Sequence, residues 1–125
     1  MTNNEHPISM ENHGSVALVT MNRPDAYNAL NRALSQAIVA TFTKIASDLS
    51  VHAVVLTGAG KAFCAGVDLK ELTANPGVLK NGSMGTNSPM VRALRECGKP
   101  IIVAINGPAV TEGFELALAL SLIHI

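Results

Sequence analysis

Hydrophobic residues along the chain form three short, nearly continuous runs, at residues 16–21, 53–56 and 101–105. Apolar runs of this length that are rich in β-branched residues are typical of strands buried on both faces. Each run is followed by a cluster that contains glycine or proline, the residues that tight turns favour. The pattern therefore predicts three strands, of which those at 53–56 and 101–105 are buried, each followed by a turn.

A long helix is predicted between the first two runs. It should begin after Asn31, whose side chain can cap a helix N-terminus. From there, apolar residues recur with the three- and four-residue spacing of one buried helix face. These apolar positions are Leu34, Ala37, Ile38, Thr41 or Phe42, Ile45, Ala46 and Leu49.

A shorter helix is predicted before the third run. Ser88 suits the N-cap position, Pro89 suits the first helical position, and Gly98 marks the end of the helix. The order strand, helix, strand, helix, strand favours the α/β class with a largely parallel sheet. The buried face of the shorter helix should take in Met90, Leu94 and Cys97.

Other segments lack such patterns. Residues 1–14 are polar and are expected to form an irregular lead-in, while residues 73–88 are rich in Gly, Asn, Ser and Pro and predict a mobile loop. The apolar residues 116–125 contain no helix stop signal. We therefore expect a truncated domain over residues 15–119. Residues 120–125 are expected to be a non-native tail, because codons for LSLIHI resemble a common sequencing adaptor.

The composition argues against several classes of function. The formal net charge is zero and aromatic residues make up 3% of the chain, which disfavours nucleic-acid binding. The sequence lacks both an apolar run of about 18 residues and the pattern of a signal peptide, so no membrane partner is expected. The four histidines lack ligand spacing, so no metal site is predicted. Cys64 and Cys97 fit a reducing compartment, and we expect a cytoplasmic protein.

One stretch of the sequence points to chemistry. The strand predicted at 101–105 is followed by a Gly-Pro turn at 106–108 and then by an apolar segment that carries Glu112 and Glu115 near its start. Acidic residues there are typical of a helix N-terminus, which aims unpaired backbone N–H groups at an oxyanion or phosphate. By contrast, residues 58–61 (Gly-Ala-Gly-Lys) lack the spacing and hydroxyl residue of a phosphate loop.

Three motifs, in order, resemble the enoyl-CoA hydratase/isomerase (crotonase) family. They are Asn22-Arg23-Pro24 with Asn28-Ala29-Leu30, AVVLTGAGKAFCAGVDLKE at 53–71, and KPIIVAINGPAV with GFELALA between 99 and 119. The resemblance covers residues 16–119 and is more specific for the family than for the reaction. It implies an α/β, crotonase-like fold of repeated β-β-α units, which is incomplete here. It also implies a homotrimer or hexamer for the full-length parent.

The resemblance implies an enzyme that acts on acyl-CoA thioesters. Two backbone N–H groups would bind the thioester carbonyl and stabilise an enolate, each contributing about 3 kcal/mol. By position, they belong to Val67 and Glu112. Glu115 matches the first catalytic glutamate of hydratases and would act as general acid/base. The alternatives are a plain turn at Ala65-Gly66 and a Glu115 that only interacts with the helix dipole.

Coenzyme A would be part of the substrate, so no separate cofactor is expected. By the same resemblance, coenzyme A would lie along Ala26, Ala65, Asp68 and Leu69, where backbone carbonyls would contact its adenine. Lys70 either reaches a phosphate of coenzyme A or is a solubilising surface lysine. The residues implied to bind the substrate and its coenzyme A are Ala26, Ala65, Gly66, Asp68, Leu69, Gly107 and Pro108.

Two features depart from the family pattern. The family normally has glycine at the position of Glu112, whose carboxylate places a negative charge beside the developing oxyanion. The second catalytic glutamate of hydratases lies further along than this sequence reaches. We predict hydration of a trans-2-enoyl-CoA, or a related isomerisation, for the parent enzyme, and inactivity for this chain alone. The alternatives are a non-catalytic acyl-CoA-binding protein and an inert truncated fragment.

Overall fold

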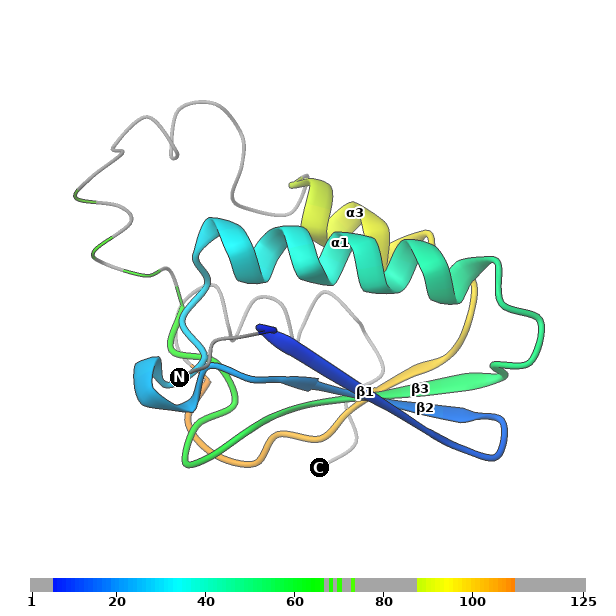
Figure 1. Cartoon of the computed structure of the whole chain (residues 1–125), viewed down its shortest axis with the longest axis horizontal. Helices are drawn as coiled ribbons and strands as arrows, with labels where there is room; N and C mark the ends of the chain where they lie inside the picture. Colours follow the sequence, from blue (N-terminus) through cyan, green and yellow to red (C-terminus); the bar gives the residue numbers. More distant parts are fainter. Residues whose placement is uncertain (1–5, 67, 69, 71–72, 74–87, 110–125) are drawn as a thin grey trace.

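The computed structural model describes residues 6–66, 68, 70, 73 and 88–109. These residues form a four-stranded sheet with two α-helices on one of its faces (Figure 1). The strands lie in the order β1 (Ile8–His13), β2 (Val16–Met21), β3 (Ala53–Gly58) and β4 (Ile101–Val103). The helices are α1 (Arg32–Ala46) and α3 (Pro89–Arg95), and a short 3-10 helix, η1, covers Pro24–Ala26.

The pairing of the strands confirms the α/β class with a largely parallel sheet. β2 pairs with β3 and β3 pairs with β4 in parallel, whereas β1 is antiparallel to β2. Parallel neighbours need a crossover connection, and α1 and α3 lie in the two crossovers. β3 continues two residues beyond the predicted end at Leu56, because Thr57 and Gly58 still pair with the last residues of β2.

Burial along the strands corrects the expectation of strands buried on both faces. In β2 and β3 every second residue is buried, and in β4 Ile101 and Val103 are buried whereas Ile102 is 39% exposed. The two described helices both cover the same face of the sheet (Figure 1). Side chains alternate between the faces of a strand, so the two described helices bury alternate residues.

Helix α1 begins and packs as its sequence predicts. The side-chain oxygen of Asn31 accepts a hydrogen bond from the Leu34 N–H at 2.8 Å and so caps the N-terminus. The helix nevertheless ends at Ala46, and Leu49 is 90% exposed, so its predicted place on the buried face is wrong. The residues of α1 that join the core are Leu34, Ile38, Phe42 and Ile45.

The end of α1 is determined by a residue far away in the sequence. The ammonium group of Lys99 donates hydrogen bonds to the carbonyls of Ile45 (3.0 Å), Asp48 (2.5 Å) and Val51 (2.7 Å). The last carbonyls of a helix lack partners within the helix, and a lysine ammonium can satisfy them. The chain therefore turns away after Ala46 and carries Leu49 into solvent.

Helix α3 confirms the predicted N-cap. The Ser88 hydroxyl accepts a hydrogen bond from the Val91 N–H at 3.2 Å, and Pro89 is the first helical residue. Met90, Leu94 and Cys97 are buried as predicted. The helix ends at Arg95, slightly before Gly98, which has a positive φ of 77°.

Strand β1 lies within the segment 1–14 that we expected to be irregular. Its backbone pairs with β2 along the whole strand, from Ile8 opposite Met21 to His13 opposite Val16. Only Ile8 is buried, and the other residues of β1 are exposed. An edge strand held by backbone hydrogen bonds needs no apolar alternation, so its sequence carries little strand signal.

Other expectations lie largely outside the described residues. Of the loop predicted at 73–88, only the first and last residues are described, and the segment 110–125 is not described. β4 covers only the first part of the run at 101–105. Across the ranges that the structure does describe, no helix has the length and apolar character needed to cross a membrane.

Candidate functional site

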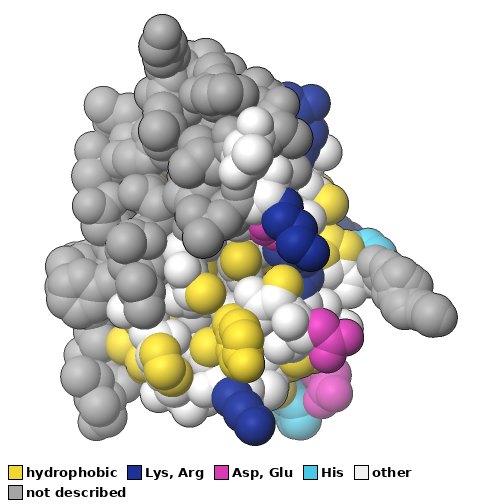
Figure 2. Space-filling view, turned by 90° about the vertical axis from the view of Figure 1, so that its left-hand side faces the viewer, with side chains coloured by type: hydrophobic (Ala, Val, Ile, Leu, Met, Phe, Trp, Pro, Cys, Tyr) yellow, Lys and Arg dark blue, Asp and Glu magenta, His cyan; other side chains and the backbone are white. Residues whose placement is uncertain are grey.

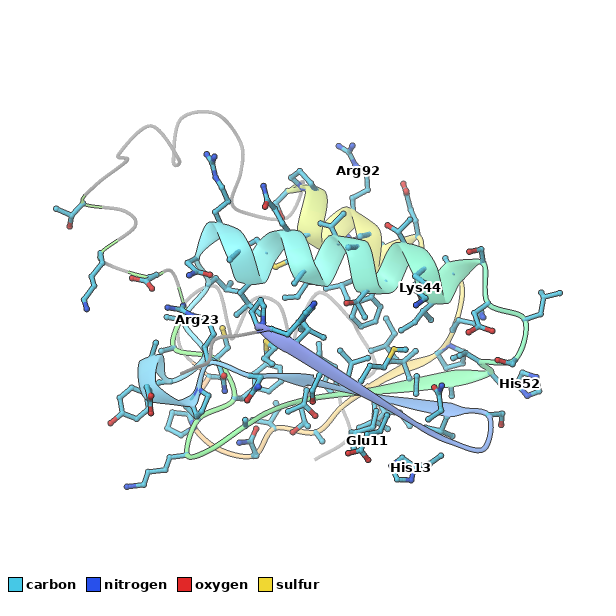
Figure 3. The ribbon with its side chains drawn as sticks, in the orientation of Figure 1. Glu11, His13, Arg23, Lys44, His52 and Arg92 are labelled. Atoms are coloured by element: carbon cyan, nitrogen blue, oxygen red, sulfur yellow. The ribbon has the colours of Figure 1, made fainter. Side chains whose placement is uncertain are left out.

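Three chain segments meet at the carboxyl ends of the parallel strands. We call them the β2 loop (residues 22–31), the β3 loop (59–66) and the β4 loop (104–109), after the strand that each one follows. The carboxyl ends of parallel strands share one edge of a sheet, which is where α/β proteins usually bind ligands. His13 and His52 lie at the opposite end of the sheet from Arg23 of the β2 loop (Figure 3).

The β2 and β3 loops are joined by backbone hydrogen bonds. The Ala65 N–H donates to the Tyr27 carbonyl at 3.0 Å, and the Leu30 N–H donates to the Gly66 carbonyl at 2.6 Å. Beyond the loop, the Asp68 N–H returns a bond to the Leu30 carbonyl at 3.0 Å. This ladder brings Ala65, Gly66 and Asp68 against one side of the β2 loop.

A charged pair strengthens the same contact. The Arg23 guanidinium lies 3.1 Å from the Asp68 carboxylate, and it also donates to the Ala29 carbonyl. The other Asp68 oxygen accepts a hydrogen bond from the Lys70 N–H at 2.9 Å. The Arg23 and Asp68 side chains are only 23% and 13% exposed, so solvent screens this pair less than a surface ion pair.

The β3 and β4 loops are also in direct contact. The Phe63 and Cys64 N–H groups both donate to the Pro108 carbonyl, at 3.0 and 3.3 Å. Cys64 and Ala109 form an isolated parallel bridge. The two segments therefore run side by side in the same direction as they leave the sheet.

Gly107 permits this close contact. A Cβ atom at Gly107 would lie 2.0 Å from the Lys61 carbonyl oxygen, a distance that no real side chain tolerates. The backbones of the β3 and β4 loops can approach this closely only because residue 107 is glycine. Gly107 and Pro108 thus have a structural role at the position where the sequence places substrate contacts.

The β2 loop contains two consecutive residues with left-handed backbone conformation. Tyr27 has a φ of 54° and Asn28 a φ of 57°. Non-glycine residues rarely adopt this conformation, and asparagine tolerates it better than most residues. The turn directs the Asn28 side chain into the interior, where it is fully buried, and leaves Tyr27 55% exposed.

Asn28 and Asn106 were not predicted as site residues, yet both make several hydrogen bonds in the site. The Asn28 amide donates to the carbonyls of Ala59 and Ala62, and its oxygen accepts from the Arg23 N–H. The signals in the sequence were weak: Asn28 belongs to the quoted family motif, and Asn106 opens a turn.

The structure describes part of the predicted substrate site. Ala26 ends η1 and is partly exposed, and Gly66 is buried with a positive φ of 92°. Ala65, Gly66 and Asp68 are brought together by the β2 loop, whereas Gly107 and Pro108 contact the β3 loop from its other side. The predicted site residues that lie outside the described residues are Val67, Leu69, Glu112 and Glu115.

The surface over these loops is mixed in character. Figure 2 views this end of the molecule, where apolar side chains lie beside those of lysine and arginine. Pro24, Tyr27 and Pro108 are exposed residues of the loops, and Lys61 and Lys70 are exposed near them in sequence. In the portion of the chain that the structure describes, no group of three or more His, Cys, Asp or Glu residues could hold a metal ion.

This chain is similar in sequence and in structure to enoyl-CoA hydratases and related CoA hydratases. Residues 11–124 match the family described as enoyl-CoA hydratase/isomerase. The chain is 44% identical over 106 residues to a probable peroxisomal enoyl-CoA hydratase 1 of Arabidopsis thaliana, covering 85% of this chain and 39% of that protein. It is 36% identical over 117 residues to an (E)-benzylidenesuccinyl-CoA hydratase of Thauera aromatica, covering 93% of this chain and 45% of that protein.

Solved structures agree with these relatives. An enoyl-CoA hydratase of Bacillus anthracis superposes with a TM-score of 0.82 at 33% identity, covering 94% of this chain and 46% of that one. An enoyl-CoA hydratase/isomerase of Mycobacterium abscessus gives a TM-score of 0.81 at 34% identity, covering 93% of this chain and 46% of that one. The chain thus spans about two fifths of the length of these two curated relatives, 39% and 45%.

Proposed function

The chain belongs to the enoyl-CoA hydratase/isomerase family and has the crotonase fold over the part that it spans, and from this membership we propose that it binds acyl-CoA thioesters. The thioester carbonyl would be held by two backbone N–H groups, those of Val67 and Glu112. The parent enzyme would hydrate a trans-2-enoyl-CoA or carry out a related isomerisation.

The contact between the β3 and β4 loops is the observation that carries this proposal. Cys64 and Ala109 are bridged in parallel, and both of their chain segments leave the sheet in the same direction. Val67 lies three residues after Cys64, and Glu112 lies three residues after Ala109. Three residues of chain span at most about 10 Å, so from this bridge a common oxygen atom is within the reach of both segments.

The chemistry needs such a pair of donors. Removing a proton from the carbon beside a thioester, or adding water to the conjugated double bond, places negative charge on the carbonyl oxygen. A preorganised N–H donor stabilises that charge by about 3 kcal/mol in the transition state. Gly66, with its positive φ, would direct the peptide that carries the Val67 N–H.

Glu115 is proposed as the general acid/base of the reaction. It lies three residues after Glu112, so on a helix the two would share a face and Glu115 would be near the carbonyl oxygen. The Glu112 carboxylate has the wrong sign for a group beside an oxyanion, so we propose that only its N–H takes part. The second acid of hydratases would have to be supplied from outside these 125 residues.

Coenzyme A is proposed to bind over the joined β2 and β3 loops. Ala26, Ala65 and Asp68 lie on these two loops and the residues that follow them, and Leu69 is adjacent in sequence. The exposed apolar residues Pro24 and Tyr27 would contact the adenine or the pantetheine chain. Lys70 is exposed and would be available to a phosphate. The coenzyme arrives as part of the substrate, so the proposal needs no separate cofactor.

The assembly and the location of the parent enzyme stay predictions. We propose a homotrimer or hexamer in the cytoplasm, acting in the breakdown of fatty or aromatic acids. Light scattering on the full-length protein would test the assembly, and a monomer would contradict it.

The 125-residue chain itself provides the test of the proposed site. The chain is mixed with trans-2-butenoyl-CoA labelled with ¹³C at the carbonyl, and the infrared band of the bound carbonyl is compared with that of the free thioester. We expect a shift to lower frequency, because two N–H donors polarise the carbonyl bond. The ultraviolet absorbance of the conjugated thioester should stay constant, because the second acid is missing.

Other outcomes would favour the alternatives. Binding of the thioester and of coenzyme A without a carbonyl shift would indicate a non-catalytic acyl-CoA-binding protein. A circular-dichroism spectrum typical of an unfolded chain, which does not change when coenzyme A is added, would indicate an inert fragment. A fall in ultraviolet absorbance would contradict the proposed inactivity of the chain alone.

A further inference from the structure

The Ala62 carbonyl accepts hydrogen bonds from two asparagine side chains that come from different loops. The Asn28 amide reaches it from the β2 loop at 2.9 Å, and the Asn106 amide reaches it from the β4 loop at 3.2 Å. Ala62 belongs to the β3 loop between them and is only 3% exposed. All three loops are therefore tied together at one buried peptide group.

Asn28 makes three hydrogen bonds through its side-chain amide. Besides Ala62, its nitrogen donates to the Ala59 carbonyl at 2.9 Å, and its oxygen accepts from the Arg23 N–H at 2.8 Å. It is fully buried and sits in a left-handed turn. Replacing its NH₂ group would leave the buried Ala62 carbonyl and the partly buried Ala59 carbonyl facing an acceptor, which is costly because buried polar groups need partners.

Asn106 makes a similar set of hydrogen bonds from the opposite side, but it is exposed, in contrast to the buried Asn28. Its nitrogen donates to the carbonyls of Gly60 (3.1 Å) and Ala62 (3.2 Å). Its oxygen accepts from the Gly58 N–H at 3.2 Å and from the Thr57 hydroxyl at 3.3 Å. In both asparagines the oxygen thus bonds its own loop or the end of β3, while the nitrogen holds carbonyls of the β3 loop.

These contacts differ from those of a regular sheet. The carbonyls of residues 59, 60 and 62 are held by side-chain donors, whereas the backbone ladder to the neighbouring loops begins at Phe63 and Ala65. The two asparagine amides therefore hold the carbonyl of the Ala62–Phe63 peptide group, and the N–H of the same group donates to the Pro108 carbonyl. From that peptide the chain runs only five residues to Val67, the proposed oxyanion donor.

We propose that Asn28 and Asn106 are positioning residues that set the spacing between the two N–H donors of the site. They hold the β3 loop at a fixed place between the β2 and β4 loops, and Val67, one of the proposed donors, follows that loop in the sequence. This inference rests on the proposed function, because it assumes that the two N–H groups act on the same thioester. Neither asparagine touches the substrate.

Asparagine-to-aspartate substitutions test the proposal, because they keep the size and the accepting oxygen of the side chain and remove its donors. The variants are Asn106→Asp and Asn28→Asp in the 125-residue chain, with Asn12→Asp as the matched control on the exposed face of β1. Each is studied with the ¹³C-labelled thioester and with coenzyme A alone. Amide hydrogen exchange at Phe63 and Ala65 reports on the loop without any ligand.

We expect both site variants to lose most of the carbonyl shift of the bound thioester. In Asn106→Asp, affinity for coenzyme A alone should stay within about twofold, since the proposed coenzyme contacts lie on the side of the β3 loop that faces the β2 loop. In Asn106→Asp, exchange at Phe63, whose N–H bonds the β4 loop, should become about tenfold faster, and exchange at Ala65 and in the paired strands β2 and β3 should not change. Asn12→Asp should leave the carbonyl shift and the exchange rates as they are.

The outcomes separate this inference from the proposed function. If the unsubstituted 125-residue chain shows no carbonyl shift, the proposed function fails, and the exchange data alone decide whether the asparagines hold the loop. If the unsubstituted chain shows the shift and Asn106→Asp retains it, the positioning role is wrong. Global unfolding of Asn106→Asp would also overturn the inference, since it would make Asn106 a residue of general stability. If the buried Asn28→Asp does not fold, the result for Asn106→Asp alone decides whether the positioning role holds.

Discussion

Arg23 and Asp68 form an ion pair of 3.1 Å between segments that are far apart in the sequence. One follows β2 and the other follows the β3 loop, and the pair lies beside the hydrogen bonds that join these segments. The pair therefore holds the β2 loop against the segment that follows the β3 loop, where coenzyme A is proposed to bind. The hydrogen bonds of the Ala62 and Pro108 carbonyls join the β3 loop to the β4 loop on its other side.

The ion pair should contribute to stability. We expect Asp68→Asn to lower the free energy of unfolding by about 1 kcal/mol in low salt and by less in high salt, because the pair is partly buried and charged. Urea denaturation at two salt concentrations measures the effect. Asp25→Asn, at an exposed position in η1, is the control. An equal loss in both variants would exclude a specific role for the pair.

Lys99 should stabilise the end of α1. Its ammonium group donates to three carbonyls at the end of that helix and in the turn that follows. Because hydrogen bonds to a charged donor are stronger than neutral ones, Lys99→Met should cost about 2 kcal/mol of unfolding free energy. Lys61→Met, at an exposed lysine, should stay within about 0.5 kcal/mol. The prediction is wrong if the two variants unfold at the same urea concentration.

Gly107→Ala should separate the β3 and β4 loops. The added methyl group would collide with the Lys61 carbonyl, so we expect a loss of about 3 kcal/mol in stability and of most of the thioester carbonyl shift. Gly14→Ala is the control: Gly14 has a positive φ of 64° but open space around its Cβ position, so its cost should be about 1 kcal/mol. Equal costs would show that the close contact is not limiting.

Asp48 should make stability depend on pH in the acidic range. The Ser50 hydroxyl and the Ser50 N–H donate to its carboxylate at 2.6 and 2.9 Å, and with the charges of Lys99 and Lys44 they hold the pKa of Asp48 below its ordinary value of 3.8. A pKa lowered by folding means that the stabilisation is present above the unfolded value and is lost as pH falls through the folded value.

Ser50→Ala removes the first of these causes. We expect the pKa of Asp48 to rise toward its ordinary value, and the acid-induced loss of stability below pH 3.8 to become smaller. A carboxyl titration by NMR measures the pKa, and urea midpoints across the acidic range measure stability. Ser47→Ala is the control, because the Ser47 hydroxyl bonds the Lys44 carbonyl instead. A pKa that moves equally in both variants would contradict the assignment.

Local sequence patterns predicted the elements whose causes are themselves local. The apolar run of β2, the Asn31 cap of α1 and the Ser88 cap of α3 depend on residues within a few positions of one another. The family could also be predicted, because its motifs are continuous stretches of sequence. In each of these cases the interacting groups are neighbours along the chain, so the pattern contains the cause.

Tertiary structure decided what depends on distant residues. β1 became a strand because β2 offered it a free edge. α1 ended early because the ammonium group of Lys99, 54 positions after Ile45, donates to the carbonyls at the end of that helix. Asn28 and Asn106 meet Ala62 across 34 and 44 positions. The sequence by itself determined the helix caps, the apolar runs of β2, β3 and β4, and the family. Only the packed sheet, which places the ends of its parallel strands at one edge, could bring the three loops and their polar side chains together.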